Sequence, residues 1–124
     1  MPIVKRGINF NFVSEMKDLP PHILKPEVHW RRAHGYLAME MYEDAKRELR
    51  ALPKEEPWGK RSKVFFLSIN QELENWEGAQ KIARGLRYEF SEEVDWWIAD
   101  AYATRRHESI TEARSILLEG LALH

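Results

Sequence analysis

Three similar segments recur at a constant spacing of 34 residues, and this repeat constrains the fold more than any other feature of the sequence. The segments are centred on Ala45, Ala79 and Ala113. An aromatic or branched residue stands three positions before each alanine and an apolar residue four positions after it, which is the spacing of a buried helix face. A helical unit of this length cannot bury its apolar face alone. The period therefore predicts an all-α protein whose units stack on one another.

Start and stop signals divide the repeats into six helices, which we expect to form three antiparallel pairs joined by short connections. Pro26 favours a helix start directly after it. Asn75 and Ser91 are predicted N-caps, and Ser109 with Glu112 forms a capping box. The expected helices cover about 27–40, 42–52, 60–72, 76–88, 92–104 and 110 onwards, in repeats of about 26–59, 60–93 and 94–124.

Residues 1–25 carry no helical period and are expected to form an irregular N-terminal arm. The stretch from Ile8 to Val13 alternates enough to predict a short extended segment, and Pro20-Pro21 interrupts any helix that begins before it. We expect this arm to pack across the first repeat. A frayed terminus with incidental apolar residues is the alternative.

Composition removes several classes of function. The 124 residues are 44% hydrophobic and 31% charged with a formal net charge of −1, so no electrostatic footprint for a phosphate backbone exists and nucleic-acid binding is not expected. The absence of cysteine excludes disulfides, iron–sulfur ligation and thiol catalysis. No segment approaches the roughly 20 apolar residues of a membrane span. A cytoplasmic protein is the expectation.

The repeats resemble the tetratricopeptide family, whose pattern is W-x2-L-G-x2-Y, then A-x3-F, then P. Residues 30–124 are also similar to small stand-alone bacterial members, in which a further repeat usually follows, so a shortened form is one interpretation. Charged or polar residues replace the expected apolar ones at several places. The matches include Ala33, Tyr36, Ala45, Leu49, Pro57, Phe66, Ala79, Trp97, Ala101, Ala113 and Leu117, and the departures include His29, Arg32, Lys63, Asn70, Ser91, Asp100 and Thr104.

The resemblance implies a right-handed superhelix, or α-solenoid, of three helix pairs, whose first helices line a concave groove. Aromatic, branched and arginine side chains recur at the positions that would face this groove, and such residues supply most binding energy at interfaces. We therefore expect a peptide-binding groove. The alternatives are that these side chains fill core between helices, or that the arm occupies the groove. The predicted groove residues are Trp30, Arg31, His34, Val64, Phe65, Ser68, Ile98, Tyr102 and Arg105.

The end of the chain carries a second candidate surface. Ile116, Leu117, Leu121 and Leu123 lie on the last predicted helix with nothing after them. Repeat proteins need polar caps to stay in solution. We expect this face to pair with a second copy as a homodimer, to be covered by the arm, or to dock a further segment.

Other motifs do not support a different site. The lysine, asparagine and arginine that clamp a peptide carboxylate in some tetratricopeptide domains are absent from the matching positions, which hold Trp30, His34, Phe65, Asp95 and Ala99. Gly59-Lys60-Arg61-Ser62 lacks the upstream glycine of a phosphate loop. His29 and His34 are five apart, whereas two metal ligands on one helix face stand four apart.

The sequence therefore predicts a protein-binding scaffold or adaptor with no catalysis, cofactor or metal. An RNA-binding helical repeat that uses the basic pairs is one alternative. A repeat that reads bases would place polar side chains at one equivalent position of each repeat, whereas that position holds Trp30, Val64 and Ile98. These pairs are otherwise interpreted as solvated edges balanced by nearby acids. A small helical enzyme is the other alternative, and no converging titratable groups support it. The basic pairs are Arg31-Arg32, Lys60-Arg61 and Arg105-Arg106.

Overall fold

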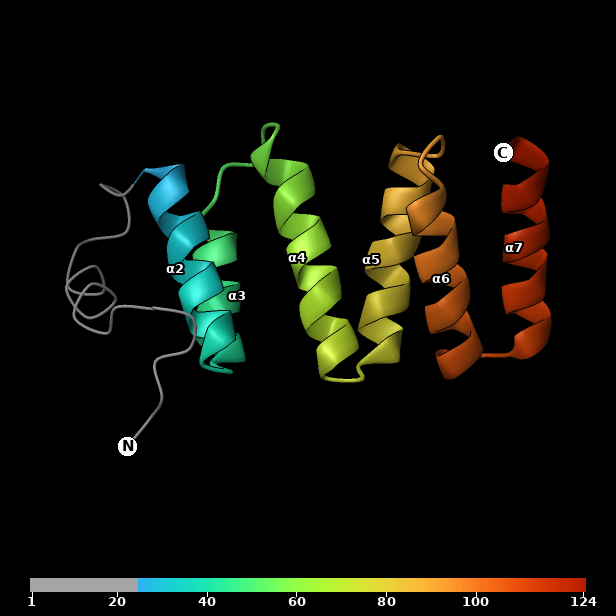
Figure 1. The fold of residues 1–124 in the computed structure, drawn as a ribbon, viewed down its shortest axis with the longest axis horizontal. Helices are drawn as coiled ribbons and strands as arrows, with labels where there is room; N and C mark the ends of the chain where they lie inside the picture. The colour runs from blue at the N-terminus through green and yellow to red at the C-terminus, as the bar shows by residue number, and fades with distance from the viewer. Residues whose placement is uncertain (1–24) are drawn as a thin grey trace. The chain divides into compact units, whose positions relative to one another are not determined.

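The computed structural model describes residues 25–124, and it contains a helix for each one expected from the repeat (Figure 1). This part of the chain has no strand. The expectations for the N-terminal arm fall on residues 1–24 and lie outside the described residues. The helices are α2 (Pro26–Ala38), α3 (Tyr42–Arg50), α4 (Trp58–Glu72), α5 (Trp76–Glu89), α6 (Val94–His107) and α7 (Ile110–Leu123).

The predicted helix starts are confirmed in three places and wrong in one. Pro26 occupies the first turn of α2. Side-chain oxygens of Asn75 and Ser109 accept hydrogen bonds from the backbone N–H groups three residues later, as N-caps do. Ser91 is not a cap, because α6 begins only at Val94. The carbonyl of Ser91 instead accepts a hydrogen bond of 2.9 Å from the indole N–H of Trp97.

The 34-residue period of the sequence is also a period of the backbone. The N–H of Met41 donates to the carbonyl of Tyr36, that of Asn75 to Asn70, and that of Ser109 to Thr104, at 2.8, 2.8 and 3.1 Å. Each bond closes the turn after a first helix in the manner of a helix C-terminal motif. Glu40 and Glu74 adopt the left-handed conformation in the first two turns, with φ of 59° and 56°. The hydrogen bond therefore recurs in all three turns, whereas the left-handed residue recurs only in the first two, because Glu108 in the third has a φ of −116°.

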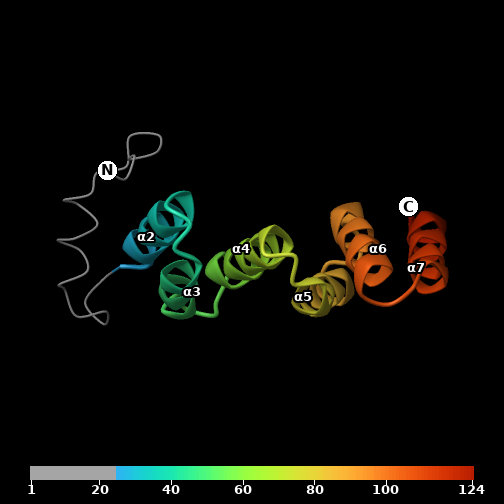
Figure 2. The ribbon, with the colours of Figure 1, turned by 90° about the horizontal axis from the view of Figure 1, so that it is seen from below.

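The chain divides into two compact units, and the boundary at Ser62 lies inside α4. In the first unit α2 and α3 pack side by side as a hairpin (Figure 2). Small side chains allow this close approach: Ala33 and Ala45 are both fully buried. Tyr36 on α2 and Leu49 on α3 are buried as well.

The second unit contains the rest of α4 with α5, α6 and α7. One core cluster joins α4, α5 and α6 through Leu67, Ala79, Ala83, Leu86 and Ala103. A second cluster joins α6 and α7 through Trp97, Ala101, Ala113 and Ile116. The alanines at the centre of the repeats are thus buried, as the period predicts. Ile116 was expected on the open face of the last helix, and this expectation is wrong because it packs against α6.

Candidate functional site

One face of α6 remains uncovered although its opposite face is fully used in packing. Ile98 and Tyr102 are 53% and 48% exposed, and Arg105 is exposed one turn further on. Asp100 and Thr104, on the opposite side, have no exposed surface. The spacing of three and four residues places the three exposed side chains along one stripe of the helix. Three predicted groove residues therefore form one accessible surface.

The ring of Tyr102 belongs to a cluster that the sequence did not predict. It lies edge-on to Trp76, the first residue of α5, with ring centroids 5.3 Å apart. The guanidinium of Arg106 lies over both rings, 5.1 Å from the centroid of Trp76 and 5.5 Å from that of Tyr102. We call these three residues the aromatic–arginine cluster. The sequence placed Trp76 only in the repeat's own apolar face and Arg106 in a basic pair, so neither was identified as a site residue.

The predicted groove residues of α4 do not form an apolar surface. Phe65 is only 6% exposed, so the prediction that it faces away from the core is wrong. Val64 is half-buried and packs against the core cluster of α4, α5 and α6. Ser68 is exposed, and its hydroxyl donates to the carbonyl of Val64 one turn earlier. Bulky apolar side chains at these positions serve stability rather than an open surface.

The remaining predicted residues, Trp30, Arg31 and His34, lie in the first unit on α2. The indole of Trp30 lies edge-on to the imidazole of His34 at 4.8 Å and tilted against Trp58 at 6.1 Å. Arg61 places its guanidinium 5.2 Å from the centroid of the Trp58 ring. Burial lowers the pKa of His34 below its usual 6.5, because the charged imidazolium loses hydration there.

A buried ionic cluster links α2 to α3. The carboxylate of Glu48 lies 2.8 Å from Nδ1 of His29 and 3.0 Å from Nη2 of Arg32. All three side chains are almost fully buried. The interpretation of Arg31-Arg32 as a solvated edge is therefore wrong for Arg32. His29 and Arg32 are departures from the tetratricopeptide pattern, and the structure shows the acid that compensates them.

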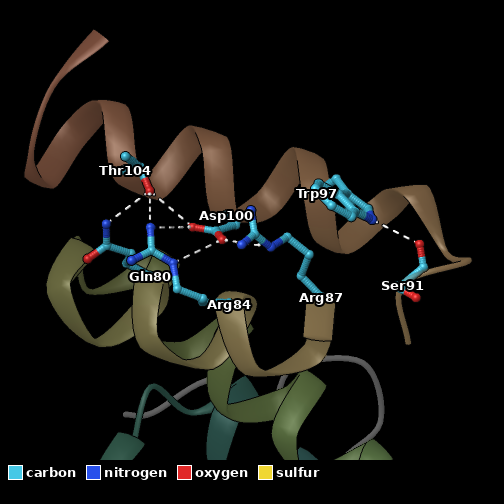
Figure 3. Close-up of polar contacts among 7 residues, drawn as sticks. All are labelled: Gln80, Arg84, Arg87, Ser91, Trp97, Asp100 and Thr104. Atoms are coloured by element: carbon cyan, nitrogen blue, oxygen red, sulfur yellow. Dashed lines mark hydrogen bonds and ion pairs between the residues drawn. The ribbon is translucent and has the colours of Figure 1, made fainter. Parts of the chain in front are cut away.

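A second ionic cluster links α5 to α6 around Asp100 (Figure 3). Arg84 donates to both carboxylate oxygens, at 3.2 and 3.3 Å, and Nε of Arg87 lies 3.5 Å from Oδ2. The hydroxyl of Thr104 donates to Oδ1 at 3.0 Å and accepts from Gln80 at 2.9 Å. The hydrogen bond to Asp100 raises the pKa of Arg84 although burial opposes the shift. Asp100, like Arg32, lies at a position where the tetratricopeptide pattern has an apolar residue.

These ionic clusters hold helices in register and offer no opening to a substrate. Asp100 has no exposed surface, and Arg87 is held between the rings of Tyr88 and Trp97, 4.8 and 4.6 Å from their centroids. A carboxylate sealed between two helices cannot reach a reacting group. The accessible candidate site is therefore the exposed stripe of α6 together with the aromatic–arginine cluster.

Comparisons with protein-family models, with curated proteins and with solved structures each find no match to this chain. Within residues 25–124, no three His, Asp or Glu side chains are grouped so that they could hold a metal ion. Over the same residues, no helix has the length and apolar character needed to cross a membrane.

Proposed function

We propose that this chain is a tetratricopeptide-like helical-repeat protein that binds a segment of a partner protein and carries out no catalysis. The backbone hydrogen bond that recurs after each first helix and the buried alanine at the centre of each repeat support this architecture. In this proposal the helix pairs stack as a right-handed superhelix, and the first helix of each pair faces the partner.

The exposed stripe of α6 is the observation that carries the proposal. Ile98 and Tyr102 are large apolar side chains on a first helix, and the core of their own unit leaves each about half uncovered. Exposed aromatic and branched side chains beside arginines are the residues that dominate binding energy at protein interfaces. Trp76 extends the same surface from α5 and is itself anchored, because it packs against the core.

A photo-crosslinking side chain placed at Ile98 tests the proposal in extracts of the source cell. We expect it to trap a partner that the same group at Tyr88 does not trap. Tyr88 is also an exposed side chain, but it lies on α5 outside the stripe. The trapped protein, once purified, is then titrated against the wild type and Tyr102→Ala.

Truncation of Tyr102 should weaken binding by about 2 kcal/mol or more and should change the melting temperature little, because the loss is one of interface rather than core. Tyr88→Ala should leave affinity unchanged. If Tyr102→Ala unfolds the protein, the ring is part of the core and the proposal fails. If the variant stays folded and binds as well as the wild type, the binding surface lies elsewhere.

A further inference from the structure

Two arginines in the last turn of α6 lack a carboxylate partner within the part of the chain that the structure describes. Arg105 and Arg106 are both exposed, and neither forms an ion pair there. Other cations of the same unit do have acidic partners: Lys63 pairs with Glu89, Lys81 with Glu77, and Arg84 with Asp100. The interpretation that nearby acids balance Arg105 and Arg106 is therefore not supported by the described contacts. The stripe of α6 thus ends in two exposed arginines that form no ion pair with a described residue.

The guanidinium of Arg106 is also held in place. It lies over the rings of Trp76 and Tyr102, and these rings contact one another. A guanidinium that stacks on aromatic faces keeps the N–H donors at its edge available, and this fork matches the two oxygens of a carboxylate. Because the side chain of Arg106 is already ordered, it loses less conformational entropy when a ligand binds than a freely moving arginine would lose. The helix dipole explains why cations are favoured at this end of α6, but it does not explain the two rings.

Charge and apolar surface are separated along α6. Ile98 lies seven residues before Arg105, and at about 1.5 Å per residue this is roughly 10 Å along the helix axis. Tyr102 lies between them and contributes to both parts of the surface. A ligand that covers the stripe must therefore present an apolar group to Ile98 and an anion about 10 Å away.

We propose that this surface binds an acidic segment of a partner protein, in which an aspartate or glutamate lies about 10 Å from a branched or aromatic side chain. The acid pairs with Arg106 and Arg105, and the apolar side chain packs on Ile98 and Tyr102. This inference rests on the proposed function, since it names the chemistry of the partner for the same surface. A protein segment is favoured over nucleic acid because the surface offers two arginines and the chain has a net charge of −1, whereas a phosphate backbone is bound by many cations.

Random-sequence peptides displayed on phage and selected on the full chain test the inference. We expect the bound peptides to combine acidic with branched or aromatic residues. The double variant Arg105→Gln/Arg106→Gln should weaken them by at least about tenfold, and the matched variant Arg114→Gln, which changes an exposed arginine of α7, should not. Binding to the wild type should weaken between ~0.05 and ~0.5 M salt, and this dependence should be reduced in the double variant.

The outcomes separate this inference from the proposed function. One possible result is that the selected peptides contain no acidic residues, bind Tyr102→Ala more weakly than the wild type, and bind the double variant as well as the wild type. This result would overturn the acidic partner but leave the proposed binding function standing. Failure of every selected peptide to depend on Tyr102 would overturn both. Competition by a mixed-sequence single-stranded RNA oligonucleotide, lost in the double variant, would overturn the inference in favour of a nucleic-acid ligand.

Discussion

Arg32 and Asp100 occupy the same place in the 34-residue register, and both are charged side chains inside the protein. They are 5% and 0% exposed. Each meets opposite charge on the helix packed against it: Glu48 on α3 pairs with Arg32, and Arg84 on α5 pairs with Asp100. An unpaired charge at either position would cost several kcal/mol. Each charge is thus compensated by a side chain on the neighbouring helix and not by exposure to solvent.

Removal of the acid from the α5–α6 cluster should be strongly destabilising. Asp100→Ala leaves Arg84 and the buried Arg87 without a counter-charge, so we expect the free energy of unfolding to fall by about 3–5 kcal/mol in urea titrations. Asp95→Ala is the control, because Asp95 is an exposed acid on the same helix and should cost less than about 1 kcal/mol. Equal effects of the two substitutions would show that the cluster contributes nothing specific to stability.

The sequence indicated where these charges depart from the repeat pattern but not what they contact. His29 and Glu48 are 19 residues apart, and Arg84 and Asp100 are 16 apart. Contacts at such separations depend on how two helices are rotated about their axes, and a period fixes only the positions around one helix. For the same reason the cluster of Trp76, Tyr102 and Arg106 could not be predicted.

At the scale of the helices, local sequence signals predicted an N-cap correctly where the side chain accepts a hydrogen bond from the first turn of the helix that follows it. Asn75 and Ser109 meet this condition. Ser91 carries the same local signal, with acids directly after it, yet α6 begins three residues later. Its carbonyl binds the indole of Trp97 and also contacts the ring of His124, 33 residues away. These bonds to residues beyond the first turn are part of the loop before α6, and a cap rule contains no information about them.

The contact between α6 and α7 depends on a glycine. A Cβ atom at Gly120 would lie 3.1–3.2 Å from three carbons of Trp97, whereas one at Gly85 in α5 would meet nothing within 4 Å. Trp97 cannot move aside freely, because its indole N–H is bonded to Ser91 and Arg87 covers its ring. The same substitution should therefore have opposite effects at the two sites.

We expect Gly120→Ala to lower the free energy of unfolding by about 1 kcal/mol or more through overpacking. Gly85→Ala should raise it by about 0.5–1 kcal/mol, because alanine favours a helix interior over glycine. Thermal and urea unfolding of the two variants measure both effects. If both variants are stabilised, the ring of Trp97 moves aside with little loss of stability, and α7 packs less tightly against α6 than the structure indicates.

At the scale of the whole molecule, the repeat predicted the number, order and approximate bounds of the helices that lie within residues 25–124. It could not predict which of the side chains at equivalent positions of successive repeats stay exposed. Val64 and Ile98 occupy equivalent positions, 34 residues apart, yet Val64 packs on a core cluster and Ile98 is exposed. Exposure depends on the helices that surround each repeat, and these differ along the chain. The candidate surface is consequently smaller than the predicted groove and is centred on α6.

The face of α7 directed away from α6 should make the purified protein self-associate. Leu118 and Leu121 are 57% and 70% exposed there, and Leu117 and Ile110 add to the same apolar surface. In a purified sample a second copy can cover this face, and burial of apolar surface favours association. Sedimentation velocity over a range of concentrations should show a reversible increase in mass. Leu118→Gln/Leu121→Gln should abolish that increase, while Leu73→Gln, which changes an exposed leucine after α4, should retain it. A wild type that remains monomeric at every concentration would show that no second copy covers these leucines.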